Sequence, residues 1–135
     1  MDDIVIVAVS GYFDPLHVGH IEYLEMAKSL GDKLIVIVNN DNQAALKKGK
    51  SFMNEEDRLT IVASLKCVDN VFLSIDQDRN VCKSLAFLKP DIFANGGDRA
   101  NKEIPEAKVC DELGITLVDG LGIKIRSSSD YTGLK

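Results

Sequence analysis

Two short runs of mostly β-branched residues constrain the fold of this chain more than any other feature. Residues 4–9 read IVIVAV, and residues 33–38 read KLIVIV. Both runs are too short for a helix. Apart from Lys33 they are apolar at consecutive positions, whereas a strand with one solvent-exposed face would alternate apolar and polar residues. Strands of this kind are buried on both faces, which is typical of a parallel sheet that helices cover on each side.

Helical and strand patterns alternate along the rest of the chain. Pro90 ends one helical pattern because a proline disfavours helical backbone at the preceding residue, and Gly31 and Gly114 stand where helices commonly end. We therefore expect an α/β, Rossmann-like fold: one domain over residues 1–135 with an open, mostly parallel five-stranded sheet and helices on both faces. Ligands of such sheets bind where loops leave the carboxyl ends of the strands. The expected helices cover residues 19–30, 54 or 55 to 65, 80–88 and 103–113, and the further strands cover residues 70–73, 91–94 and 116–118.

The charge and the apolar pattern exclude several classes of protein. A formal net charge of −5 argues against a nucleic-acid partner, because such affinity comes largely from basic side chains that displace counterions. No apolar run approaches the length of a membrane span, and the N-terminus lacks the basic start of a signal peptide. We therefore expect a cytoplasmic protein without membrane contact. Cys67, Cys82 and Cys110 form no C-x-x-C pair, so we expect reduced thiols and no metal site.

Both histidines of the chain lie where the loop after the first expected strand enters a helix. His17 and His20 are three residues apart and therefore face the same side of the first helical turn. A helix start presents unpaired N–H groups to an anion, and Gly19 leaves room for a phosphate near the backbone. These residues predict a phosphate site with two imidazole donors. The alternative is that His17 caps the helix and His20 is packed or on the surface; a metal held by the pair would lack further ligands except Asp14.

Residues 11–20 read GYFDPLHVGH and resemble the G-x-F-D-x-x-H-x-G-H signature of the cytidylyltransferase-like nucleotidyltransferases, with agreement at every specified position. The resemblance implies an in-line displacement, in which a phosphate oxygen of the acceptor attacks the α-phosphorus of an NTP and pyrophosphate leaves. No covalent enzyme intermediate is implied, so catalysis consists of positioning and charge stabilisation. Further similar segments are residues 30–36, 39–41, 56–58, 96–98 and 127–129.

The resemblance also implies catalytic and substrate-binding roles. His17 and His20 would donate hydrogen bonds to the α- and β-phosphates, and Lys47 would meet both the acceptor phosphate and the α-phosphate. Residues 48 and 50 are lysines that could replace Lys47, and the whole basic stretch could instead be a solvated turn. Arg58 would hold the acceptor phosphate through its planar guanidinium, or else be a surface arginine in an intrahelical pair.

The nucleotide-binding residues that the resemblance implies come from three parts of the chain. Gly96 would let the backbone approach the base or ribose of the nucleotide, and the Asp98 carboxylate would accept a hydrogen bond from a ribose hydroxyl or an amine. A structural turn explains this pattern equally well. Asp14 orients the loop or a Mg²⁺-bound water, or else is an Asx-turn residue. The serine triplet at residues 127–129 would bind the triphosphate through its hydroxyls and successive backbone N–H groups, or else belongs to a flexible tail. Many relatives have an aliphatic residue where Arg126 stands. The full set is Gly11, Tyr12, Phe13, Asp14, Gly19, Gly96, Asp98, Arg126, Ser127, Ser128 and Ser129.

Two segments bear on the nucleotide and the acceptor. Residues 39–41 (NND) and 95–98 (NGGD) look like the V-N-S-D and K-G-G-D segments of heptose-1-phosphate adenylyltransferases. Cytidylyltransferases tend to carry G-D-D at the second of these segments. We therefore expect ATP rather than CTP and a phosphorylated sugar or polyol as acceptor. The resemblance also implies Mg²⁺ with the nucleotide. Relatives are commonly homodimers, but the sequence leaves the oligomeric state of this chain open. The alternatives are a CTP-dependent glycerol-3-phosphate-type cytidylyltransferase, an FAD synthase, and a nucleotide-binding regulatory protein without turnover.

Overall fold

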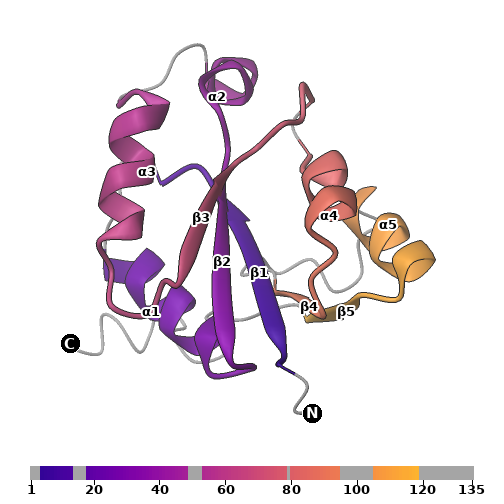
Figure 1. Cartoon of the computed structure of the whole chain (residues 1–135). Helices are drawn as coiled ribbons and strands as arrows, with labels where there is room; N and C mark the ends of the chain where they lie inside the picture. Colours follow the sequence, from indigo (N-terminus) through magenta and orange to yellow (C-terminus); the bar gives the residue numbers. More distant parts are fainter. Residues whose placement is uncertain (1–3, 14–17, 49–52, 79, 95–104, 119–135) are drawn as a thin grey trace, which may run out of the picture.

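The computed structural model describes residues 4–13, 18–48, 53–78, 80–94 and 105–118. These residues form five strands and five helices that alternate along most of the chain (Figure 1). The strands are β1 (Ile6–Gly11), β2 (Lys33–Val38), β3 (Asn70–Leu73), β4 (Ile92–Ala94) and β5 (Thr116–Val118); the helices are α1 (Val18–Lys28), α2 (Asp41–Lys48), α3 (Glu55–Ala63), α4 (Cys82–Leu88) and α5 (Pro105–Leu113).

The strands form one sheet in the order β3-β2-β1-β4-β5, and every pairing between them is parallel. The predicted α/β fold is therefore confirmed. The chain first builds outward from β1 through β2 to β3, and then crosses back to add β4 and β5 on the other side of β1. Because such crossovers are right-handed, the reversal places later helices on the opposite face of the sheet.

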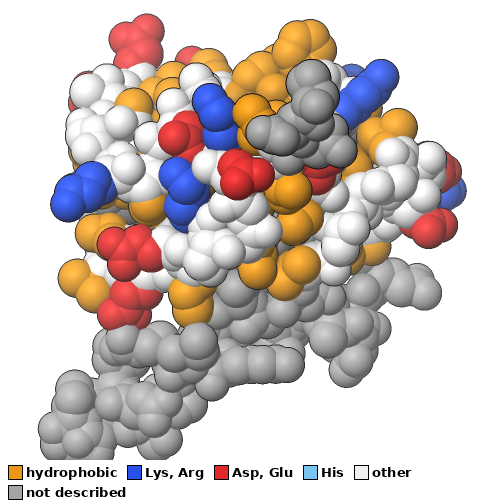
Figure 2. Space-filling model, turned by 60° about the horizontal axis from the view of Figure 1, so that its bottom comes forward, with side chains coloured by type: hydrophobic (Ala, Val, Ile, Leu, Met, Phe, Trp, Pro, Cys, Tyr) orange, Lys and Arg blue, Asp and Glu red, His pale blue; other side chains and the backbone are white. Residues whose placement is uncertain are grey.

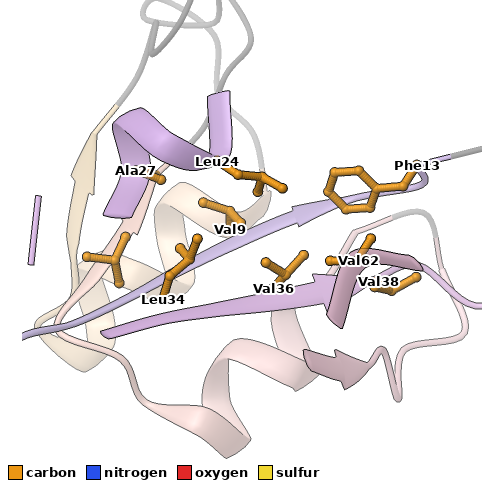
Figure 3. Packing of buried hydrophobic residues seen from close by; sticks show 10 residues of the cluster. Val9, Phe13, Leu24, Ala27, Leu34, Val36, Val38 and Val62 are labelled. Atoms are coloured by element: carbon orange, nitrogen blue, oxygen red, sulfur yellow. The ribbon is translucent and has the colours of Figure 1, made fainter. Parts of the chain in front are cut away.

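The two faces of the sheet carry separate apolar layers. Successive side chains of a strand point to opposite faces: in β1, Val7 and Val9 belong to one buried cluster, while Ala8 belongs to the other. The first cluster also holds residues of α1 and α3, including Leu24 and Val62 (Figure 3). The second holds residues of α4 and α5, which lie on the other side of the sheet in Figure 1.

Three aspartates close the amino edge of the sheet. Each stands directly before a strand and accepts a backbone N–H at the start of the neighbouring strand: Asp32 from Val5 at 2.7 Å, Asp69 from Leu34 at 2.8 Å and Asp91 from Ile6 at 2.8 Å. Lys28 also donates to Asp69 at 3.0 Å. The face seen in Figure 2, on which the strands begin, accordingly mixes acidic, basic and apolar side chains.

Helix α2 corrects the sequence analysis, which expected no helix between the second strand and the helix that begins at residue 54 or 55. The segment lacks the apolar periodicity of a core-facing helix, and among its described side chains only Gln43 and Ala44 are buried. It forms because Asn40 and Gln43 make a reciprocal capping box: the Gln43 N–H donates to Asn40 Oδ1 at 2.9 Å, and the Asn40 N–H donates to Gln43 Oε1 at 3.0 Å.

The other elements agree with expectation apart from shifts at their ends. The first strand runs from Ile6 to Gly11 rather than over residues 4–9, which extends it toward the loop with the histidine motif. The last helix ends before Gly114, whose φ of +75° is the left-handed conformation that favours glycine.

Candidate active site

The strand order locates the candidate site. Crossovers leave β1 and its neighbour β4 toward opposite faces, and a parallel sheet binds ligands at such a switch point, beyond the carboxyl ends of the strands. The loop after β1 leads into α1, whose first turn contains Gly19 and His20. The described residues of the histidine motif therefore lie at the edge of the sheet where ligand chemistry is expected.

Phe13 turns the chain at the end of β1 and supports His20. Its φ of +52° is unusual for a residue other than glycine, and its side chain is only 1% exposed. The ring folds back into the apolar layer between β1 and α1 (Figure 3). It also contacts the imidazole of His20 edge-on, with ring centroids 5.1 Å apart.

This arrangement requires glycine at position 11. A Cβ at Gly11 would lie 2.7 Å from Cζ of Phe13, closer than atoms in packed proteins approach. The Gly11 carbonyl accepts the Asn39 N–H at 2.9 Å, which joins the ends of β1 and β2. Gly11, the last residue of β1, and Phe13 are thus packed against each other before the rest of the motif, and both can affect the site without contacting a nucleotide.

Tyr23 connects α1 with the far side of the switch point. Its hydroxyl donates to the carbonyl oxygen of Ala94, the last residue of β4, at 3.0 Å. Helix α1 therefore carries His20 and also binds the end of β4, after which the expected nucleotide-binding turn begins.

Arg58 joins the loops at the carboxyl ends of β1 and β2. Its side chain is fully buried, and its Nη2 forms an ion pair with Asp41 Oδ1 at 2.7 Å. The guanidinium also donates to the carbonyl oxygens of Tyr12 at 2.9 Å, Asn39 at 2.6 Å and Met53 at 2.9 Å. Because a buried charge is costly unless it is paired and hydrogen-bonded, these contacts account for its burial.

A second polar network ties α2 to the loop after β3. The Asn40 side chain donates to the carbonyl oxygens of Ser74 and Asp76 at 2.9 and 3.0 Å. The Gln43 side chain donates to those of residues 78 and 80 at 2.6 and 2.9 Å. These roles of Asn40 and Gln43 were not predicted from the sequence, although an Asn-x-x-Gln pattern after an apolar strand is typical of a capped helix.

Several expected site residues lie outside the described part of the chain. Lys47 belongs to α2, but its side chain lies outside that part, as do all atoms of Asp14, His17, Gly96, Asp98, Arg126, Ser127, Ser128 and Ser129. Their roles, and those of His20, Tyr12 and Gly19, stay predictions. The structure brings together Gly11, Tyr12, Phe13, His20 and Arg58 around the end of β1.

The described residues contain no cluster of three or more His, Cys, Asp or Glu side chains that suits a metal ion. The described helices include none that is long and apolar enough to cross a membrane. Desolvation, followed by the charge of Glu106, raises the pKa of Cys82 to about 11, and the same two causes raise that of Cys110 to about 11. Both thiols therefore stay neutral near pH 7 and are poor nucleophiles.

The all-parallel sheet, with His20 in the first turn of the helix that follows β1, has the Rossmann-like architecture common among nucleotide-binding proteins. The family model described as cytidylyltransferase-like matches residues 8–116. This protein belongs to the cytidylyltransferase-like family of nucleotidyltransferases, as the signature in residues 11–20 predicted.

Similar proteins fall into two groups. Bifunctional protein HldE of Helicobacter pylori (strain P12) is 44% identical over 106 residues, which are 77% of this chain and 23% of that protein. The HldE of Aliarcobacter butzleri (strain RM4018) is 39% identical over 118 residues, 85% of this chain and 24% of that protein. The chain thus spans about a quarter of the length of these relatives. The FAD synthase of Thermoplasma volcanium is 36% identical over 127 residues, 94% of this chain and 84% of that protein.

Solved structures support the same fold. A lipopolysaccharide core biosynthesis protein from Thermoplasma volcanium superposes with a TM-score of 0.71 and 32% identity, over 87% of this chain and 94% of that one. A protein of unknown function from Archaeoglobus fulgidus shares the fold with a TM-score of 0.65 and 19% identity, over 85% of this chain and 88% of that one.

Proposed function

We propose that residues 1–135 form a single nucleotidyltransferase domain of a cytoplasmic enzyme that transfers AMP from ATP to a phosphorylated sugar or polyol and releases pyrophosphate. The observation that carries the proposal is the G-x-F-D-x-x-H-x-G-H signature, whose described residues stand at the switch point with His20 in the first turn of α1. Family membership and the HldE relatives support this class of reaction.

The chemistry follows from what these side chains donate. An oxygen of the acceptor phosphate forms a bond to the α-phosphorus, the bond between that phosphorus and the bridging oxygen breaks, and pyrophosphate leaves with its electron pair. His20 and His17 would donate hydrogen bonds to the phosphates, and Lys47 would neutralise charge that accumulates around the α-phosphate. The start of α1 adds unpaired N–H groups and the positive end of the helix dipole.

Mg²⁺ fits this scheme as an ion that arrives with the triphosphate, because magnesium is commonly held by substrate phosphates together with one or two carboxylates. When bound, it would neutralise part of the phosphate charge. Asp14 is the carboxylate proposed to orient one of its waters, and the proposed loop of Ser127, Ser128 and Ser129 would hold the remaining phosphate oxygens.

A second acceptor has a specific observation in its favour. The FAD synthase relative is matched over most of its own length and nearly all of this chain. By its name, its product contains an adenylyl group on a flavin phosphate, so FMN is the second candidate acceptor. Both candidate acceptors would attack the same α-phosphorus of ATP. They differ in the group that the acceptor-binding part of the site must recognise, a sugar or polyol in one case and a flavin in the other.

The test is pyrophosphate release with Mg²⁺, crossing ATP and CTP against heptose 1-phosphate, glycerol 3-phosphate and FMN. Release with ATP and heptose 1-phosphate supports the proposal, and release with ATP and FMN supports the second acceptor. Release only with CTP contradicts the proposed base. Bound nucleotide without release for any acceptor favours a regulatory protein.

His20→Ala tests the residue assignment. We expect turnover to fall roughly 100- to 1000-fold, which is typical for the loss of one such donor. Glu25→Gln is the matched control, because Glu25 is an exposed residue of the same helix, and it should keep near-normal turnover. Near-normal turnover of His20→Ala would show that His20 is not a phosphate donor.

A further inference from the structure

Arg58 makes contacts that differ from those of a substrate-binding arginine. A residue that holds a substrate phosphate directs its guanidinium into the open site, usually with two parallel N–H groups. In this protein the side chain has no exposed surface, and four of its N–H groups donate to protein oxygens. Little donor capacity is left for a ligand.

The four acceptors belong to the segments that surround the site. One is the carbonyl of Tyr12, in the loop that leads to the histidine motif. Two others lie at the end of β2 and at the start of α2, on Asn39 and Asp41. The fourth, Met53, precedes α3 itself. Arg58 therefore fixes the histidine loop and α2 against the same helix.

Helix α2 depends on such polar contacts for its position. Its described side chains bury one alanine and the amide of Gln43, so apolar packing holds it weakly. Two residues of α3 bind Asp41, the first residue of α2: Glu55 accepts the Asp41 N–H at 2.8 Å, and Arg58 donates to the Asp41 carboxylate. In Figure 1, α2 lies beyond the carboxyl ends of the central strands, at the edge of the sheet where β1 ends.

We propose that Arg58 is a positioning residue, which sets α2, and with it Lys47, in register with the histidine loop instead of binding the acceptor phosphate. This inference rests on the proposed function, since it assigns Lys47 to the reaction. It changes the role that the family resemblance implied for Arg58. The arginine fork is suited to this task because it reaches four oxygens in fixed directions, which a lysine ammonium cannot reproduce.

Asp41→Ala tests the proposal without emptying the buried arginine site, because the Asp41 side chain is 43% exposed and Arg58 keeps its three carbonyl partners. We expect kcat to fall about tenfold, with KM for both substrates within about twofold of wild type, since the lost interaction is not with substrate. Hydrogen exchange of the amides of Ala45 and Leu46 should accelerate about tenfold, while that of Val62 in α3 stays unchanged.

Arg58→Lys is the second variant, and Glu56→Ala is the matched control, an exposed acidic residue in the first turn of α3. The lysine variant should show the same loss of kcat and the same faster exchange in α2, and the control should show neither. A rise in KM for the phosphorylated acceptor alone, with kcat and α2 exchange unchanged, would overturn the proposal and make Arg58 a substrate ligand. Unchanged kinetics in Asp41→Ala would also overturn it. Failure of the proposed function is a separate result, because wild type itself would then release no pyrophosphate.

Discussion

Gly11→Ala should disturb the stability of the protein and the geometry of the site together. The new methyl group would lie 2.7 Å from Cζ and 2.9 Å from Cε2 of Phe13, so the ring must move. The ring has no free space to enter, because Phe13 is 1% exposed and packs in the cluster between β1 and α1 (Figure 3). Its movement also removes the edge contact that supports His20.

The size of the effect follows from this contact. Forcing one extra carbon into a packed core costs about 1–3 kcal/mol. Loss of the aromatic edge contact adds about 0.5–1 kcal/mol. We therefore expect a destabilisation of about 1.5–4 kcal/mol. Turnover should fall as well, because the ring that supports His20 moves.

Urea unfolding of Gly11→Ala, Phe13→Leu and the double variant measures this coupling. Leucine is smaller than phenylalanine, so the double variant should be less destabilised than the sum of the two single changes by about 1 kcal/mol or more. Gly114→Ala is the control: it places alanine at a φ of +75° with nothing within 4 Å of the new carbon. Its cost comes from the backbone alone and should add to that of Phe13→Leu. Additive costs for Gly11→Ala and Phe13→Leu would refute the steric argument.

Two further predictions concern titrating groups. The backbone N–H of Leu34, followed by the Lys28 ammonium, lowers the pKa of Asp69; this stability is present above the unfolded pKa, near 4, and is lost as pH falls through the folded pKa. Asp69→Asn should therefore be less stable than wild type by about 1 kcal/mol near neutral pH, and the gap in urea midpoints should close in acid; a gap that persists at about pH 2 would contradict this. Burial raises the pKa of Cys110 from 9.0 to about 11. The neutral thiol therefore contributes stability that is fully present below the unfolded pKa of 9.0, and this contribution is lost as pH rises through about 11. As pH rises from 9.0 to about 11, the free energy of unfolding should therefore fall less for Cys110→Ala than for wild type. A disulfide-exchange reagent near pH 8 should label Cys110 only after unfolding. Rapid labelling of Cys110 in the native protein would contradict the argument.

The sequence by itself determined the class of fold and the place of the candidate motif relative to the first strand. Runs such as residues 34–38 are apolar at consecutive positions, and their alternation with helical patterns favours strands buried inside a covered parallel sheet. The motif in residues 11–20 follows the first of these strands, so its place at the carboxyl edge of the sheet follows from strand direction alone. The end of helix α5 before Gly114 could also be predicted from the sequence, because the preference of glycine for a positive φ is a local property of the backbone.

Only the tertiary structure decided how polar residues are used at that edge. Helix α2 has no apolar stripe, so its existence depends on the capping box of Asn40 and Gln43 and on contacts with segments far away in sequence. The burial of Arg58 likewise depends on partners from residue 12 to residue 53. Hydrophobic periodicity records which face of an element is buried, but a hydrogen bond between distant segments leaves no period in the sequence. The same guanidinium can therefore be read as a ligand for phosphate until the fold shows which oxygens it already binds.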